Sequence, residues 1–237
     1  MKLCFCVLVA AVTLPCQANG QIINVRGLPN IDYAIATANN VEVVKHQTLQ
    51  QFEENALEDL ALCALRNTRS EVDRTLALKV DSHDYVKAMT ALASSKCLRP
   101  GSYSFQPSAF RAALFRELYR SEFRHHAPAA LRNSARYPSD IDDPSSDFGK
   151  AYLVSRKLAD CVVVADPADS RKLVLLEIGD RHEKKLFASL TSPLQNCLPA
   201  GATVSLDSYQ VSEWIAEALY RESKLALGAD NAGGGQH

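Results

Sequence analysis

Hydrophobic residues recur with helical spacing in two stretches of the chain. In the later stretch, apolar side chains stand three, four, seven and eight positions after the first, which is the stripe of a core-facing helix: Val211, Trp214, Ile215, Ala218 and Leu219. The earlier stretch carries a broader version of this stripe: Phe110, Leu114, Phe115, Leu118 and Tyr119. Both stretches are therefore predicted to form amphipathic helices with one buried face.

The similarity of the two stretches continues on both sides of each helix. Cys-Leu-Arg-Pro-Gly at 97–101 recurs as Cys-Leu-Pro-Ala-Gly at 197–201. Both helices then close on Leu-Tyr-Arg, at 118–120 and at 219–221. A repeat that includes cysteines, loop and helix end indicates a duplicated structural unit. We predict an all-α protein of two tandem homologous helical modules, packed together around the repeated helices.

The two repeated helices are also predicted to begin alike. Phe105 and Phe110 are five positions apart, as are Leu206 and Val211. This is the spacing of a hydrophobic staple across a helix N-terminus. Gln106 is then predicted to be the N-cap of the first helix, with a proline at the next position, where the missing N–H costs no hydrogen bond.

Three shorter patterns predict the rest of the first module. A helix over 49–65 has apolar residues on one side and acidic residues on the other. Thr68, with Glu71 three positions later, is predicted to cap a short second helix. A third helix is predicted over 81–94. Asp166 stands in the second module where Thr68 stands in the first, so the same break is expected there.

One segment of the second module has two readings. Residues 172–178 read Lys-Leu-Val-Leu-Leu-Glu-Ile, a short apolar run that suits either a buried strand or a buried helix. Periodicity alone does not separate these alternatives. Its correspondence with residues 74–80 of the first module favours a helix.

Composition marks the segments outside the modules. The linker, residues 125–149, is rich in Pro, Ser and Asp and has no period, and the last residues are rich in Gly, Ala and Asn. The predicted organisation follows in chain order: signal peptide 1–18, extended arm 19–47, first helical module 48–124, linker 125–149, second helical module 150–225, disordered tail 226–237.

The first residues predict export. One positive charge precedes an apolar run that is too short to span a bilayer, and small and polar residues follow it. We expect a signal peptide cleaved near Ala18, which gives a periplasmic or secreted protein. Attachment of a lipid at Cys16 is an alternative, although Leu14 and Pro15 make a poor lipobox.

Export decides how the cysteines are interpreted. The mature chain keeps an even number, two in each module at corresponding places, and an exported protein forms disulfides from such a set. The duplication favours pairing within each module, Cys63 with Cys97 and Cys161 with Cys197. A zinc site made of the same thiolates is the alternative, but the close Cys-x-x-Cys pairs of such sites are missing.

Composition and motifs exclude several function classes. The 237 residues are 47% hydrophobic and 22% charged with a formal net charge of -1, an ordinary globular composition. Without a Lys/Arg-rich run, the chain lacks the electrostatic pattern of a nucleic-acid binder or of an anionic membrane surface binder. No phosphate loop, dinucleotide fingerprint or nucleophile elbow is present. We therefore predict no cofactor and assign no catalytic residue.

Histidines beside carboxylates provide the strongest hint of chemistry. Asp-Ser-His-Asp at 81–84 resembles Asp-Arg-His-Glu at 180–183, and such groups bind metals or act as acid and base. A metal-dependent hydrolase using His83 and His182 is therefore the alternative function. The simpler interpretation makes each cluster a helix start with Asp at the N-cap, so no metal site is predicted. Residues 125–126, both His, are attributed to a solvated helix end.

The repeated Leu-Tyr-Arg places the same phenol and cation near the end of both major helices. Arg120 and Arg221, with Tyr119 and Tyr220, are therefore candidate contacts for a ligand or partner, because a guanidinium binds a carboxylate or phosphate through two parallel hydrogen bonds. The structural alternative is that each arginine caps a helix C-terminus and pairs with a glutamate across the interface of the modules.

The duplicated Cys-Leu-x-x-Gly and Leu-Tyr-Arg pattern covers most of the mature chain. It resembles a group of small exported proteins of alphaproteobacteria for which no activity is known. The resemblance implies an all-helical periplasmic or secreted protein, and it brings no catalytic residue with it. We expect a non-catalytic interaction or structural protein of the periplasm, whose partner and oligomeric state the sequence does not specify.

Overall fold

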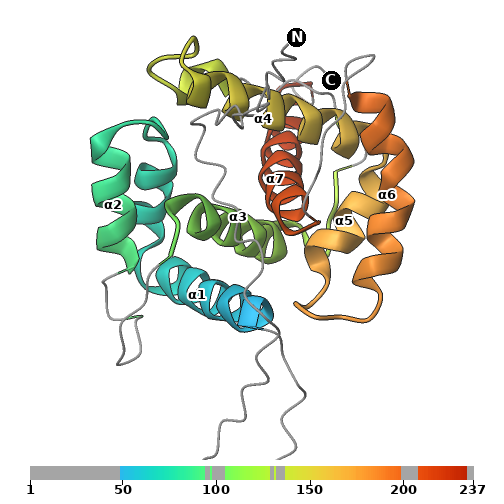
Figure 1. Cartoon of the computed structure of the whole chain (residues 1–237), viewed down its shortest axis with the longest axis horizontal. Coiled ribbons are helices and arrows are strands. Elements are labelled where there is room, and N and C mark those ends of the chain that lie inside the picture. The colour runs from blue at the N-terminus through green and yellow to red at the C-terminus, as the bar shows by residue number, and fades with distance from the viewer. Residues whose placement is uncertain are drawn as a thin grey trace, which may run out of the picture.

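The structure is a computed structural model that describes residues 49–93, 97, 105–128, 131, 137–198 and 208–233. Every regular element within these residues is helical, which confirms the predicted all-α fold (Figure 1). The elements are α1 (Leu49–Leu76), α2 (His83–Ala93), α3 (Pro107–Phe123), the 3-10 helix η1 (Tyr137–Asp140), α4 (Asp147–Ala165), α5 (Pro167–Leu175), α6 (Glu183–Cys197) and α7 (Ser208–Gly233).

The first helix is broken where the sequence predicted a break, but not by the predicted cap. Thr68 has non-helical backbone angles (φ -142°, ψ 40°) inside α1. Its hydroxyl donates back to the carbonyl of Ala64 in the preceding turn, and no capping hydrogen bond to it is found among the described residues. Asp166 separates α4 from α5 with similar angles (φ -140°, ψ 76°), and its carboxylate does accept from the N–H of Asp169. A single kinked helix in the first half thus corresponds to two helices in the second.

The segment with two readings is helical over residues 172–175. Helix α5 ends at Leu175, and Leu176 is extended (φ -64°, ψ 147°). The prediction of a helix is therefore confirmed for the first part of 172–178, and the remainder begins the turn toward α6.

The start of α3 agrees with its pattern. The rings of Phe105 and Phe110 pack edge to face with their centres 5.4 Å apart, as a hydrophobic staple requires. Gln106 is extended at the N-cap position and Pro107 follows at the first helical position. The Gln106 side chain makes no capping hydrogen bond, so the staple and the proline define this helix start. Leu206, in the second predicted staple, lies outside the described residues.

Helices α3 and α7 pack against each other and join the two halves of the molecule (Figure 1). Helices α1 and α2 pack on α3, while α4 and α5 pack on α7 and α6 covers α4 and α5. Each half has its own apolar core, but the cores interlock. Tyr152 of α4 packs in the first core, and Tyr119 and Phe123 of α3 pack in the second.

Both predicted disulfides are present. Cys63 in α1 is bonded to Cys97 after α2, with a Cα–Cα distance of 5.6 Å. Cys161 in α4 is bonded to Cys197 at the end of α6, with a Cα–Cα distance of 5.8 Å. Both distances are ordinary for a disulfide. The first bond therefore links α1 to the segment that follows α2, and the second links α4 to the end of α6.

Two predicted segment boundaries meet a different structure. Part of the linker is packed, since Tyr137 and Ile141 are buried in the first core, and α4 begins at Asp147 inside it. Helix α7 continues to Gly233, past the start of the predicted tail at 226. The signal peptide, the arm and Cys16 lie outside the described residues. Within the described ranges, no helix combines the length and apolarity needed to cross a bilayer.

Candidate functional site

The most charged part of the interior lies between α3, α4 and α7. Glu217 of α7 accepts from Arg111 of α3 at 2.8 Å and 3.1 Å. Arg156 of α4 and Arg221 of α7 each place a nitrogen 2.9 Å from the same carboxylate. The side chains of Arg111 and Glu217 are only 3% and 1% exposed. Three arginines from three helices thus surround one buried carboxylate.

The arginines determine the charge state of Glu217. Burial alone would raise the pKa of Glu217, but the charges of Arg111, Arg156 and Arg221 outweigh it and hold the pKa far below its ordinary value. The carboxylate is therefore ionised throughout the physiological range. A group fixed in this way balances buried cations and does not exchange protons with a substrate.

Aromatic rings cover the same arginines. Each guanidinium carbon lies 5.0 or 5.1 Å from a ring centre, within the range of a cation–π contact. The pairs are Arg111 over Phe115, Arg156 over Tyr152 and Arg221 over Tyr137. The cluster is thus held by ion pairs and by packing, and it joins the first half, the linker and the second half.

A second charge cluster lies at the matching place in the first half. Arg116 of α3 donates to Glu58 of α1 at 3.0 Å, and also to the hydroxyl of Ser212 in α7. Glu58 and Arg116 correspond to Arg156 and Glu217 with the two charges exchanged. An ion pair therefore joins α1 to α3 and another joins α4 to α7. The glutamate lies on α1 in the first pair and on α7 in the second.

The contacts between the halves are reciprocal. With the repeat offset of 101 positions, Arg116 of α3 corresponds to Glu217 of α7, and Ser212 of α7 corresponds to Arg111 of α3. The contact between Arg116 and Ser212 therefore has its counterpart in the contact between Glu217 and Arg111. The same two places on α3 and α7 therefore meet twice. Such reciprocity is the property of an interface related by a two-fold axis.

The structure places the predicted contact residue Arg120 within the interface. Its guanidinium donates to the carbonyl of Val174 at 3.2 Å and to that of Leu176, at the C-terminal end of α5. It also lies 2.8 Å from Glu58 and 2.6 Å from Glu117. Arg120 thus caps a helix of the other half, where free carbonyls attract a cation.

The other three predicted contact residues are also held by internal partners. Tyr119 is buried in the second core. Tyr220 donates to Glu122 at 3.1 Å, and Arg221 pairs with Asp140 at 2.7 Å as well as with the buried carboxylate described above. The repetition of Leu-Tyr-Arg therefore coincides with the packing of the two halves.

The structure does not bring His83 and His182 together. Helices α2 and α6 stand on opposite sides of the molecule (Figure 1), and the described residues contain no group of three or more His, Cys, Asp or Glu arranged to hold a metal. His182 instead lies 2.8 Å from Asp180. Residues 125–126 follow α3 and are exposed.

The predicted N-cap of α2 needs a correction. Ser82, not Asp81, accepts from the N–H of Tyr85 and caps the helix. Asp81 accepts instead from the N–H groups of Asp142 and Asp143, at 3.0 to 3.2 Å. Because these residues follow η1, the carboxylate of Asp81 fixes the linker against the start of α2.

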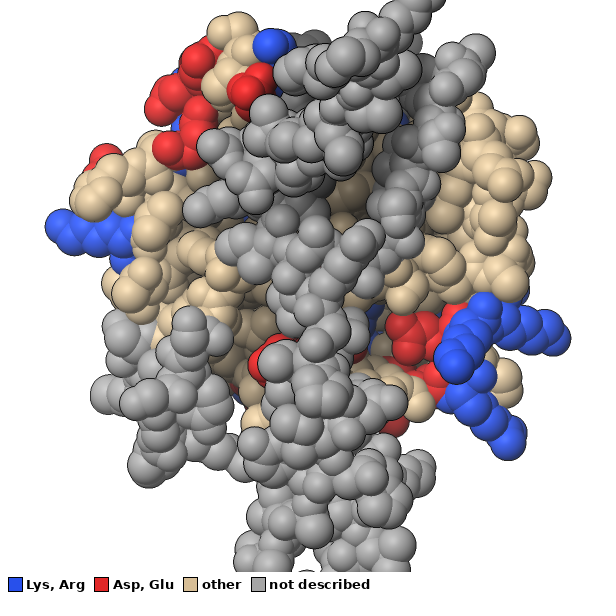
Figure 2. All heavy atoms as spheres, viewed as in Figure 1, with Lys and Arg blue, Asp and Glu red and all other residues tan. Residues whose placement is uncertain are grey.

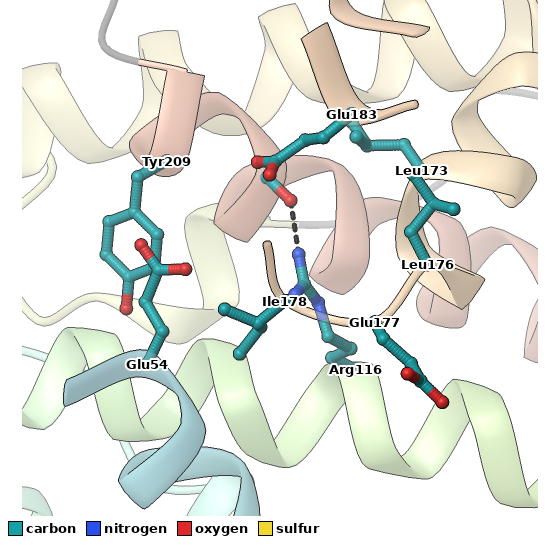
Figure 3. A pocket seen from close by; sticks show the side chains of 9 residues that line it. Glu54, Arg116, Leu173, Leu176, Glu177, Ile178, Glu183 and Tyr209 are labelled. Atoms are coloured by element: carbon teal, nitrogen blue, oxygen red, sulfur yellow. Dashed lines mark hydrogen bonds between the residues drawn. The ribbon is translucent and has the colours of Figure 1, made fainter. Parts of the chain in front are cut away.

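A surface hollow lies where α1, α3, α7 and the turn between α5 and α6 meet (Figure 3). It consists of two adjoining depressions that share Glu54, Arg116, Ile178 and Tyr209. The space open to the centre of a water molecule is about 10 Å³ in one and about 20 Å³ in the other, which suits about one water or one terminal group each. We call it the glutamate hollow because its lining carries five carboxylates: Glu54, Glu58, Glu177, Glu183 and Glu213.

Acidic groups outnumber basic ones in the described lining of the glutamate hollow. Arg116 is the only cation among the described residues that line it, and Glu58 pairs with Arg116 and with Arg120 from outside the hollow. In Figure 3 the carboxylate of Glu54 lies beside the ring of Tyr209, and the dashed line marks the hydrogen bond from Arg116 to Ser212. Burial and the neighbouring anions Glu213 and Glu54 raise the pKa of Tyr209, and its phenol is hydrogen-bonded to Glu213. The phenol therefore stays neutral beside an acidic pair.

One wall of the glutamate hollow depends on a glycine. Gly179 has φ +76°, a left-handed conformation that side chains with a Cβ seldom adopt. This turn presents Ile178 to the hollow and brings the chain against Gln51, whose amide lies 3.0 Å from where a Cβ would stand. The turn after α5 thus contacts the first helix of the other half.

Charged side chains gather in two regions of the face seen in Figure 2. Acidic groups lie at the upper left, where Figure 1 shows the turn before α4. Acidic and basic groups lie together at the lower right, where the connection from α5 to α6 runs. The second region borders the glutamate hollow, since Glu177 and Ile178 belong to that connection and Glu183 begins α6.

Sequence patterns did not identify the glutamate hollow. Its acids come from α1, the α5–α6 turn, the start of α6 and α7, so their meeting depends on how the halves pack. The one available signal was acidic residues near the N-terminus of α1, which is also explained by the helix dipole.

Comparisons of the chain with protein-family models, with curated proteins and with solved structures give no match.

Proposed function

We propose that the protein is an exported, non-enzymatic binding protein of the bacterial periplasm, and that the glutamate hollow binds a basic side chain of its partner. The observation that carries this proposal is the lining of the hollow. Among the described lining residues, five glutamates and a phenol face a depression with one arginine, in a chain whose net charge is only -1. Glu58 pairs with Arg116 and Arg120, so the cationic group would meet the other four glutamates. Electrostatic complementarity of this kind favours a cationic group.

The shape of the glutamate hollow favours lysine as that group. Leu57 and Ile178 supply an apolar wall, against which the methylene stem of a lysine can pack. Glu54 and Glu213 lie beyond that wall, beside Tyr209, where the ammonium can donate to carboxylates. The small volume admits the end of a side chain, which a protein or peptide partner can present.

Two further observations support the cellular setting. Disulfides persist in oxidising compartments such as the periplasm, and the chain holds two of them. The apolar run at the N-terminus is of signal-peptide type. The reciprocal contacts of α3 and α7 also support the inference that the halves arose by duplication. From the repeated Cys-Leu-x-x-Gly and Leu-Tyr-Arg sequences we infer a resemblance to exported alphaproteobacterial proteins.

Peptide binding to the mature, disulfide-bonded protein tests the glutamate hollow. We expect a blocked tri-lysine peptide to shift the NMR signals of Ile178 and Tyr209, and its norleucine analogue, which keeps the stem but lacks the ammonium, to leave them unchanged. Glu54→Gln should weaken the lysine peptide about tenfold, because a hydrogen bond to a charged group contributes about 1.5–3 kcal/mol.

Glu71→Gln serves as the matched control, since Glu71 lies on the same helix but is half-exposed and outside the hollow. It should bind the lysine peptide as the unaltered protein does. Equal binding of the lysine and norleucine peptides, or equal losses in both variants, would show that the hollow is not a cation site.

The absence of catalysis is tested separately with the two histidines. We expect neither bound metal nor metal-dependent stabilisation in untagged protein. Metal-dependent hydrolysis that disappears in His83→Ala and His182→Ala, but persists in His125→Ala, would overturn the non-enzymatic assignment.

A further inference from the structure

Asp160 is a buried carboxyl group that no part of the proposed binding function uses. It lies on α4 next to Cys161 and is 2% exposed. The phenol of Tyr137, also 2% exposed, donates to it at 2.5 Å. Because Tyr137 belongs to η1, this hydrogen bond fastens the linker to the second half.

Several charged groups face Asp160. Arg156 lies one turn away on α4, and α7 contributes Arg221 and Glu222. The linker contributes Tyr137. The sides of α5 and α6 that pack toward α4 in the second core are aliphatic: Leu173, Val174, Leu190 and Leu194.

This environment favours the protonated carboxyl. Burial and the charge of Glu222 raise the pKa of Asp160 from 3.8 to about 7, although Tyr137 and the two arginines act in the opposite direction. An opened state in which water reaches Asp160 restores the ordinary value. Protonation of Asp160 therefore stabilises the closed state fully below about pH 4. This stabilisation declines as the pH rises and is lost through pH 7.

We propose that the Tyr137–Asp160 contact is a pH-responsive latch that holds residues 137–141 on α4 in acid and loosens them as the pH rises from acid to neutrality. Two features of the fold support a local response. Residues 137–141 form a short segment between the halves, and Ile141 is buried in the first core while Tyr137 reaches α4. Loosening this segment exposes Asp160 without breaking either disulfide.

Two measurements on the full mature chain test the latch. We expect the carboxyl carbon of Asp160 to titrate near pH 7 in ¹³C NMR. We also expect hydrogen exchange of residues 137–141, corrected for the intrinsic rate, to reveal an opening equilibrium that rises about tenfold per pH unit between about pH 5 and 7. In Asp160→Asn the opening should not depend on pH.

Asp147→Asn, on the same helix but exposed, is the control and should behave as the unaltered protein. The NMR titration needs no variant, so it decides the matter even if Asp160→Asn folds poorly. An Asp160 pKa below 5, or the same pH profile in the Asp160 and Asp147 variants, would overturn the proposal.

Discussion

Glu217 shows why single residues of this interface escape sequence patterns. It lies on α7 beside the apolar stripe, and a glutamate there is normally solvated. Its burial depends on Arg111 and Arg156, which are more than sixty positions away. By contrast, Tyr119 and the apolar members of both stripes were predicted to be buried because helical spacing alone places them on one face. Charge pairing across helices has no comparable local pattern.

Replacing Glu217 should destabilise the protein strongly. Glu217→Gln leaves Arg111, Arg156 and Arg221 with one fewer anion, and breaking a buried pair costs about 3–5 kcal/mol. We expect a loss of this size in the free energy of unfolding measured with denaturant at pH 7. Glu71→Gln, half-exposed on α1, should change it by less than about 0.5 kcal/mol.

The same variant should alter the response to acid. Because the arginines hold the pKa of Glu217 well below 4.5, its contribution is present above pH 4.5 and falls as the pH drops toward the folded value. Stability of the unaltered protein should therefore decline more steeply below about pH 4.5 than that of Glu217→Gln. Parallel acid curves would contradict the assigned ion pairs.

At the scale of elements, helix starts were more predictable than the turns between them. The staple and the proline placed α3 correctly, and the break at Asp166 placed the start of α5. The turn before α4 was predicted only as a linker, because its hydrogen bonds to Asp81 join residues about sixty positions apart. The end of α7 was misplaced, since small residues that suit a tail also fit a helix.

Two glycines provide an element-scale prediction with a built-in control. A Cβ on Gly149 in α4 would stand 2.2 Å from the carbonyl oxygen of Asp143, whereas a Cβ on Gly228 in α7 would meet nothing within 4 Å. Gly149→Ala should therefore lower the free energy of unfolding by about 1–3 kcal/mol. Gly228→Ala should raise it by up to about 1 kcal/mol, through helix propensity. A stabilising Gly149→Ala would mean that the turn before α4 lies farther from the helix.

For the whole molecule, the sequence predicted both disulfides and the central helix pair, but the interlocking of the cores was not predicted. Tyr152 crosses into the first core, and Tyr119 and Phe123 cross into the second. The periodicity of a helix shows that a residue is buried and leaves open which neighbour covers it. The glutamate hollow was missed for the same reason, because its walls belong to both halves.

Removing one disulfide should test how far the halves depend on each other. The double variant Cys161→Ala/Cys197→Ala removes the bond between two cysteines that are 36 positions apart in sequence. We expect the free energy of unfolding to fall by about 2–4 kcal/mol. Because the cores interlock, thermal unfolding should remain a single transition for both halves. Separate transitions for the first and second halves would show that the α3–α7 contact does not couple them.

The reciprocal contacts of α3 and α7 determine which surfaces recognise each other. In the same arrangement, two first halves would place Arg111 of each against Arg116 of the other, a repulsion repeated twice. Two second halves would place Ser212 against Glu217, so each Glu217 would keep Arg156 and Arg221 of its own half but lose Arg111. The mixed pair alone joins Arg111 to Glu217 and Arg116 to Ser212. The chain is in this sense a tethered heterodimer, and neither half is a suitable partner for a copy of itself in a neighbouring molecule.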